Sequence, residues 1–235
     1  ANLGFISNSN GIDNEIEILS AQDLATQAVI DMKCYVNYYH KGTFKDQLVY
    51  KEQEVNVDLD LAHLKKLNAP IKLKIEKDGN QYLVTGSYYI PVDAFSSQKE
   101  PVKIEKTLAS LPASINTRVG TLHFTQNGKY ALKDGESLKV IIVSPEIAAK
   151  GYTKALAVSQ TSKTTTIAEL VLKDEDPQRS IDYLNTLIKV YNRQANEDKN
   201  EISFRTEQFI NQRLEKINNE LGNTEGQLES YKKRN

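Results

Sequence analysis

The sequence has almost no cysteine, no long apolar run and no excess of charge of either sign. Its 235 residues include a single cysteine, Cys34, which excludes an internal disulfide and disfavours a zinc site of the usual cysteine-containing types. The 30 lysines and arginines nearly balance the 31 aspartates and glutamates, so the formal net charge is −1. That balance offers no electrostatic attraction for nucleic acid or an anionic membrane surface, and we expect no nucleic-acid partner.

No stretch approaches the roughly 20 consecutive apolar residues that a membrane-spanning helix needs. The densest apolar run, Val140–Val143, has the length of a strand core. An initiating methionine and a signal peptide are also missing. We expect the chain to be an excised soluble part of a longer protein. The single cysteine leaves the redox compartment open.

Patterns that indicate catalysis are sparse as well. The three histidines, His40, His63 and His123, are scattered along the chain, and none stands at metal-ligand spacing from another. We interpret them as surface or half-buried side chains, and Cys34 as a small buried residue. We therefore predict no catalytic, cofactor-binding or metal-binding residues in this chain.

Two pairs of acidic residues invite comparison with a general acid–base pair. Asp58 and Asp60 alternate with leucines, which predicts that both lie on the solvated face of a strand. Glu15 and Glu17 fall near the expected beginning of a helix, where the helix dipole favours acidic side chains. We interpret both pairs as surface residues.

The distribution of apolar residues predicts an α+β fold. After a turn-forming lead-in at residues 1–12, helical periodicity covers residues 13–32, and Ser20–Asp23 resembles a capping sequence that renews the helix. Alternating residues and turns such as Asp78–Asn80 predict a β-rich middle at about 45–150, inside a base domain of residues 1–175 with a mixed sheet. Ser144 and Pro145 begin a short helix. The predicted strands are 35–39, 55–61, 71–75, 82–90, 102–104, 121–124, 138–143, 155–159 and 165–172.

Residues 176–235 predict one long amphipathic helix that extends from the base domain. Asp176 suits the N-cap position, Pro177 suits the first helical position, and no further proline follows. Apolar residues recur at the intervals that one helix face requires, and the chain offers no second helix to cover them. We predict that part of this face is a partner or oligomer surface. The face comprises Ile181, Leu184, Ile188, Tyr191, Ala195, Ile202, Phe209, Ile210, Leu214, Ile217, Leu221 and Leu228, and the candidate partner surface is Ile210, Leu214, Ile217, Leu221 and Leu228.

Three stretches together carry a family resemblance. They are Asn14–Leu24 with the strand ending in Tyr38-Tyr39, Asp174–Asn192 at the start of the long helix, and Phe209–Lys232 along it. In this order they resemble the extracytoplasmic domain of the polysaccharide co-polymerases, which are the bacterial chain-length determinant proteins and the periplasmic part of related capsule or exopolysaccharide tyrosine kinases. The β-rich middle is more similar to the larger insertion of Bacteroidetes-type relatives.

The resemblance implies an α/β base near the inner membrane and two flanking membrane helices. It also implies a long helix that enters the periplasm and returns as a coiled-coil hairpin, of which residues 176–235 would be the truncated first half. Members assemble as ring-shaped homo-oligomers. Together with a polymerase or exporter, they set the chain length of lipopolysaccharide O-antigen, capsule or exopolysaccharide. In the kinase branch, an ATP-binding domain and a tyrosine cluster lie on the cytoplasmic side. The resemblance therefore implies that this chain has no active site, that its partners are other copies, a polymerase or exporter and the polysaccharide itself, and that it lies on the periplasmic side.

Two other classes of function remain as alternatives. A periplasmic coiled-coil adaptor or scaffold of an export system would share the long helix but not the motifs of the base. A soluble glycan-active enzyme would need a pair of catalytic acids, and neither acidic pair in this sequence supports one.

Overall fold

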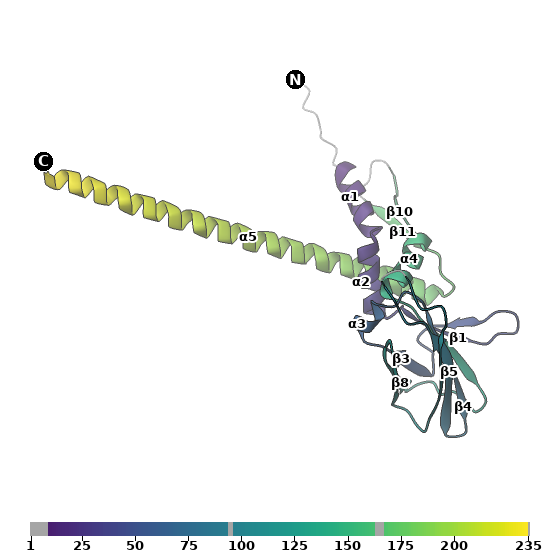
Figure 1. Ribbon diagram of the computed structural model, residues 1–235. Helices are drawn as coiled ribbons and strands as arrows, with labels where there is room; N and C mark the ends of the chain where they lie inside the picture. Colours follow the sequence, from purple (N-terminus) through teal and green to yellow (C-terminus); the bar gives the residue numbers. More distant parts are fainter. Residues whose placement is uncertain (1–8, 94–95, 163–166, 235) are drawn as a thin grey trace. The chain divides into compact units, whose positions relative to one another are not determined.

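The computed structural model describes residues 9–93, 96–162 and 167–234, and it describes their side chains except for residues 9–11, 223 and 225–234. Helices and strands are both abundant and the sheets are antiparallel, so the predicted α+β class is confirmed (Figure 1). The chain divides into two compact units, residues 1–190 and 191–235. Within the described residues, no helix combines the length and the apolar character needed to cross a membrane.

A six-stranded sheet forms the centre of the first unit, with the strand order β2-β1-β9-β4-β5-β6. We expected a mixed sheet, but every pairing described in it is antiparallel. The strand connections explain this. A hairpin joins β4 to β5, and β9 inserts between β1 and β4, antiparallel to both. The predicted β-rich middle is therefore the main part of the base sheet. The strands are β1 (Val36–His40), β2 (Gln47–Val49), β4 (Ile71–Asp78), β5 (Gln81–Tyr88), β6 (Val102–Leu108) and β9 (Ser137–Ile142).

The β4–β5 hairpin has the turn that the sequence predicts. Asp78 pairs with Gln81, and Gly79 between them has a φ of 59°, which glycine adopts at little cost. Along β4, Ile71, Leu73 and Ile75 are buried while the lysines between them are exposed. This strict alternation fixes which face of the sheet meets the core.

A second, three-stranded sheet has the order β3-β8-β7, with β3 (Val55–Asp58), β7 (Ala113–Thr117) and β8 (Gly120–Gln126). Val57 and Phe124 are buried on one face of this sheet. The hydroxyl of Tyr38 in β1 accepts from the backbone N of Val57 at 2.8 Å and lies 3.3 Å from the carbonyl oxygen of Val57. Tyr38 therefore links the two sheets, and burial raises its pKa to about 12.

The first two helices differ from the prediction in their boundaries. Helix α1 (Ser9–Leu19) begins earlier than residue 13, so Glu15 and Glu17 lie in its body and the dipole explanation for them was wrong. Helix α2 (Gln22–Met32) begins as predicted, but Ser20 does not cap it. The hydroxyl of Ser20 donates instead to the carbonyl oxygen of Ile16 at 2.7 Å, within the end of α1. Residues 9–12 of the predicted lead-in belong to α1, and residues 1–8 lie outside the described part of the chain.

The strand predicted across residues 55–61 ends at Asp58 and is followed by helix α3 (Leu61–Leu64). The carboxylate of Asp60 accepts from the backbone N atoms of Ala62 and His63 at 3.0 and 3.1 Å, so it caps that helix. Asp58 and Asp60 therefore do not share a strand face, as we had predicted. The strand was predicted too long because Leu59, which is buried between the two aspartates, continues the alternation of apolar and polar residues beyond Asp58.

Helix α4 (Pro145–Ala155) is capped by Ser144 as predicted, since the Ser144 hydroxyl accepts from the Ile147 backbone N at 3.2 Å. Helices α2 and α4 pack together, and Figure 1 shows them at one end of the six-stranded sheet. After α4, β10 (Leu156–Gln160) and β11 (Ala168–Leu172) form a two-stranded antiparallel sheet. The predicted residues Thr165 and Thr166 of this second strand lie outside the described residues.

Helix α5 (Pro177–Arg234) begins with the predicted cap, because the carboxylate of Asp176 accepts from the Arg179 backbone N at 2.8 Å. Its first turns belong to the first unit, where Tyr183, Leu187 and Val190 are fully buried. The ring of Tyr183 stacks on Tyr152 of α4 with the ring centroids 4.1 Å apart.

The buried face at the beginning of α5 is not the one that we predicted. Ile181 and Ile188 are 53% and 42% exposed, although we placed both on the apolar face of this helix. The packed residues, Tyr183, Leu187 and Val190, also recur at helical spacing. Both sets of residues recur at helical spacing, so periodicity alone does not distinguish the two faces. Packing against the first unit buries the face that carries Tyr183.

Candidate functional site

The first candidate site is the apolar face of α5 in the second unit. Ile210, Leu214, Ile217 and Leu221 lie at helical spacing, and each side chain is about half exposed, at 50%, 52%, 49% and 55% respectively. The structure therefore places these four residues of the candidate partner surface together on one exposed helix face. Leu228, the fifth, lies in α5, but its side chain is outside the described part of the structure.

Polar and charged residues occupy most of the remaining helix surface, where Phe204 is also exposed. Arg205 pairs with Glu201, and Lys216 with Glu220, each at the i, i+4 spacing. Such pairs stabilise an exposed helix by a few tenths of a kcal/mol each, about 0.2–0.5. The helix is thus amphipathic, with an apolar surface that the described residues of its own unit leave uncovered.

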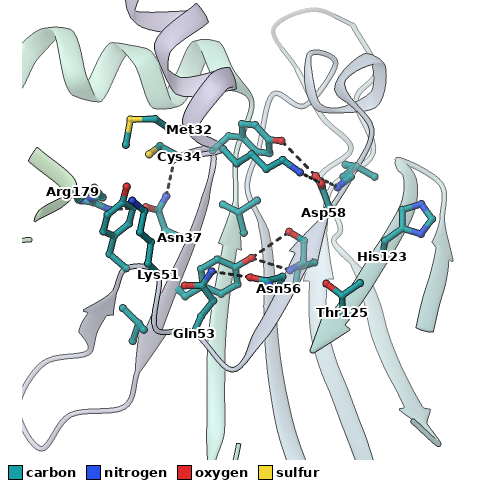
Figure 2. A pocket seen from close by; sticks show the side chains of 18 of the residues that line it. Met32, Cys34, Asn37, Lys51, Gln53, Asn56, Asp58, His123, Thr125 and Arg179 are labelled. Atoms are coloured by element: carbon teal, nitrogen blue, oxygen red, sulfur yellow. Dashed lines mark hydrogen bonds and ion pairs between the residues drawn. The ribbon is translucent and has the colours of Figure 1, made fainter. Parts of the chain in front are cut away.

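The second candidate site is a cleft inside the first unit, with a volume of about 830 Å³. It lies between β1, the β2–β3 loop and the strands β3 and β8 (Figure 2). Asn56 and Asp58 of β3 stand opposite Thr125 and His123 of β8, respectively. Because side chains alternate along a strand, these four lie on the face opposite the buried Val57 and form one wall of the cleft.

Asp58 is held from three sides. Lys33 forms an ion pair with its Oδ2, the Leu59 backbone N donates to Oδ1 at 2.9 Å, and the Tyr35 hydroxyl donates to Oδ1 at 3.4 Å. Burial and the nearby Asp58 carboxylate raise the pKa of Tyr35, which therefore stays a neutral donor. Lys33 has a φ of 56° because it terminates α2 in the left-handed conformation.

The opposite wall contains Asn37 of β1 and Arg179 of α5, both labelled in Figure 2. The Arg179 guanidinium donates through Nη1 to Asn37 Oδ1 at 2.9 Å and through Nε and Nη2 to the Asp174 carboxylate. Burial alone would lower the pKa of Arg179, but its hydrogen bonds to the Asp174 carboxylate raise that pKa well above the ordinary value. Arg179 is thus a fixed cation, with each of its three nitrogens donating one hydrogen bond to Asn37 or Asp174.

The β2–β3 loop closes the third side of the cleft. Lys51 has a φ of 62°, a conformation uncommon for a residue other than glycine. Its Nζ donates to Asp182 Oδ2 at 2.5 Å, and the Tyr50 hydroxyl donates to the same oxygen at 2.8 Å. These two hydrogen bonds lower the pKa of the Asp182 carboxyl and fasten the loop to the first turns of α5.

The predicted surface histidines are separate from one another in the structure. The Nε2 of His40 lies 3.0 Å from the buried Glu54, His63 pairs with Asp60, and the Nδ1 of His123 lies 2.9 Å from the Ser114 hydroxyl. Among the described residues, no group of three or more histidine, cysteine, aspartate or glutamate side chains is placed to hold a metal ion.

Cys34 is 5% exposed, as the prediction of a small buried residue requires, and burial raises the pKa of its thiol. It lies in the lining of the cleft together with Arg179. No sequence pattern predicts the cleft, because Asn56 and Thr125 are simply polar residues in two segments that lie far apart in the chain. No local motif connects them.

No protein-family model matches this chain, and no curated protein matches it in sequence.

Proposed function

We propose that this chain is a non-catalytic structural and assembly module of an inner-membrane protein that regulates the length and export of a surface polysaccharide. The observation that carries the proposal is the exposed apolar face at Ile210, Leu214, Ile217 and Leu221. An apolar helix face of this kind is stable in water when a partner covers it, so it supports a role in assembly.

The sequence resemblance to polysaccharide co-polymerases supports the choice of polysaccharide assembly as the process in which this role is exercised. In this proposal the parent protein is a homo-oligomer that works with a polysaccharide polymerase or exporter at the periplasmic side of the inner membrane. Its polysaccharide is an O-antigen, a capsule or an exopolysaccharide, and the parent belongs to the branch with a cytoplasmic tyrosine kinase. The apolar face of α5 contacts the returning helix and neighbouring copies.

Deletion of the parent gene tests the proposal, with the length distribution of the surface polysaccharide measured by gel electrophoresis. We expect the distribution to shift or lose its preferred length, and re-expression of the intact parent to restore it. An unchanged distribution in the deletion strain would overturn the proposal. Loss of small-molecule export with normal polysaccharide would instead favour the adaptor of an export system.

A further inference from the structure

We propose that the cleft between β1, the β2–β3 loop and β3–β8 binds a short, uncharged segment of carbohydrate. The inference rests on the proposed function for the choice of carbohydrate among neutral ligands rich in hydroxyl groups. The cleft volume of about 830 Å³ lies within the range of roughly 300–1,000 Å³ that is typical of small-ligand sites. Charge, unsatisfied hydrogen-bonding groups and the apolar part of the lining each support it.

The charged side chains of the lining favour a neutral ligand, because each of them already has a partner. Lys33 pairs with Asp58, Lys51 with Asp182, Arg179 with Asp174, and Asp60 with His63. An ionic ligand would have to displace one of these partners or stay uncompensated in a partly buried site, and both are costly. A neutral ligand avoids that cost.

Two amides of the lining have unused hydrogen-bonding capacity. The Nε2 of Gln53 donates to Asn56 Oδ1 at 2.8 Å, and Gln53 Oε1 is buried without a protein partner among the described residues. The Nδ2 of Asn56 likewise has no partner there. If both amides are turned over, one donor and one acceptor still remain unused. A sugar hydroxyl both donates and accepts, so one or two such groups satisfy this pair.

Asn56 stands directly opposite Thr125 across the β3–β8 ladder, and both line the cleft (Figure 2). Thr125 is exposed, and its hydroxyl adds a further group able to donate and accept. The Asn56 amide and the Thr125 hydroxyl thus lie side by side on the β3–β8 ladder, and Gln53 reaches Asn56 from the adjacent loop. Such an arrangement fits adjacent hydroxyls on a sugar ring.

The tyrosines supply apolar surface next to these polar groups. Tyr35, Tyr38 and Tyr50 line the cleft, and their hydroxyls are bound to Asp58, Val57 and Asp182, respectively. Tyr35 and Tyr38 are only 5% and 8% exposed, so the half-buried Tyr50 offers the most ring surface to a ligand. A sugar carries both hydroxyls and apolar C–H groups, and an amphipathic lining of this kind complements it.

Titration calorimetry on the whole chain tests the inference, with maltotriose and tri-N-acetylchitotriose as neutral probes and a triuronic acid as the charged comparison. We expect at least one neutral probe to bind and the triuronic acid to bind more weakly. Asn56→Ala and Thr125→Ala should each weaken binding by about three- to tenfold, the effect of one lost hydrogen bond. Asn116→Ala and Thr107→Ala make the same changes on exposed strand positions outside the cleft and should leave binding unchanged.

Circular dichroism establishes that each variant is folded. Thr125 is exposed, so Thr125→Ala tests the cleft even if Asn56→Ala lowers stability. The inference is overturned if no neutral probe binds at millimolar concentration, if the triuronic acid binds more tightly, or if both cleft variants bind like the wild type. These outcomes leave the proposed function standing, since that depends on polysaccharide length in the deletion strain. An unchanged length distribution, in turn, overturns the proposed function whatever binds the cleft.

Discussion

Arg179 donates to both carboxylate oxygens of Asp174, through Nε at 2.7 Å and through Nη2. The two side chains are only 14% and 4% exposed, so this bidentate pair is largely removed from water. The third hydrogen bond of the guanidinium, to Asn37, reaches β1. The beginning of α5 is therefore joined to the central sheet by one planar cation, whose geometry lysine cannot reproduce.

Removal of either partner should leave a buried charge without compensation. We expect Asp174→Ala to lower the free energy of unfolding of the first unit by about 3–5 kcal/mol. Arg205→Ala removes the exposed pair with Glu201 on the same helix and should cost less than about 0.5 kcal/mol. Urea denaturation followed by near-ultraviolet circular dichroism of the tyrosines measures both. Equal effects of the two changes would contradict the importance of the buried pair.

Two adjacent residues of α5 test which face of the helix packs on the base. Leu187 is fully buried, and Leu187→Ala should cost about 2–5 kcal/mol through lost burial and the resulting cavity. Ile188 is 42% exposed, and Ile188→Ala should change stability by no more than about 0.5 kcal/mol. The comparison uses the same urea measurement. A larger loss at Ile188 would mean that the originally predicted face is the packed one.

The features predictable from sequence are those that depend on near neighbours in the chain. The cap by Asp176 and the turn at Gly79 each follow from the chemistry of a few consecutive residues, and both are present in the structure. The end of β3 was missed because Leu59 continues the strand alternation, whereas the side chain of Asp60 accepts from the following backbone N atoms and starts a helix.

The remaining features depend on contacts between distant parts of the chain. The buried face of α5 is selected by the stacking of Tyr183 on Tyr152, which periodicity alone does not reveal. The cleft needs β3 and β8 to pair so that Asn56 meets Thr125, and it also needs β1 to lie opposite them. Neither polar residue differs in its local sequence from an ordinary solvated strand position.

The link between the β2–β3 loop and α5 should weaken in acid. Hydrogen bonds from Lys51 and Tyr50 lower the pKa of Asp182 in the folded state. The stabilisation is therefore complete above the unfolded pKa of about 3.9 and is lost as the pH falls through the lower folded value. Asp182→Asn should be less stable than the wild type at pH 7, and the difference should shrink between about pH 4 and pH 2. Urea midpoints at pH 7, 5, 3 and 2 measure it, and a constant difference would contradict the assignment.

Cys34 should be unreactive in the folded protein. Its thiol is 5% exposed, and burial raises its pKa, so both access and the thiolate fraction are low. We expect labelling by a colourimetric disulfide reagent at pH 8 to be slow in buffer and fast in urea. A Cys34→Ala chain that carries Ser203→Cys on the exposed surface of α5 should react at once in buffer. Rapid labelling of the native wild type would show that the first unit opens readily at this position.

The apolar face of α5 should determine assembly of the parent protein. Leu214→Asp with Leu221→Asp puts two charges on that face, so burial of the face in an interface becomes costly. Gln212→Asp adds a charge to the polar surface of the same helix turns and serves as the control. We expect the double variant to reduce the oligomer of the membrane-extracted parent protein, measured by light scattering, and to shift the polysaccharide length as the deletion does. The control should match the wild type in both measurements, whereas an intact oligomer in the double variant would exclude this face from the interface.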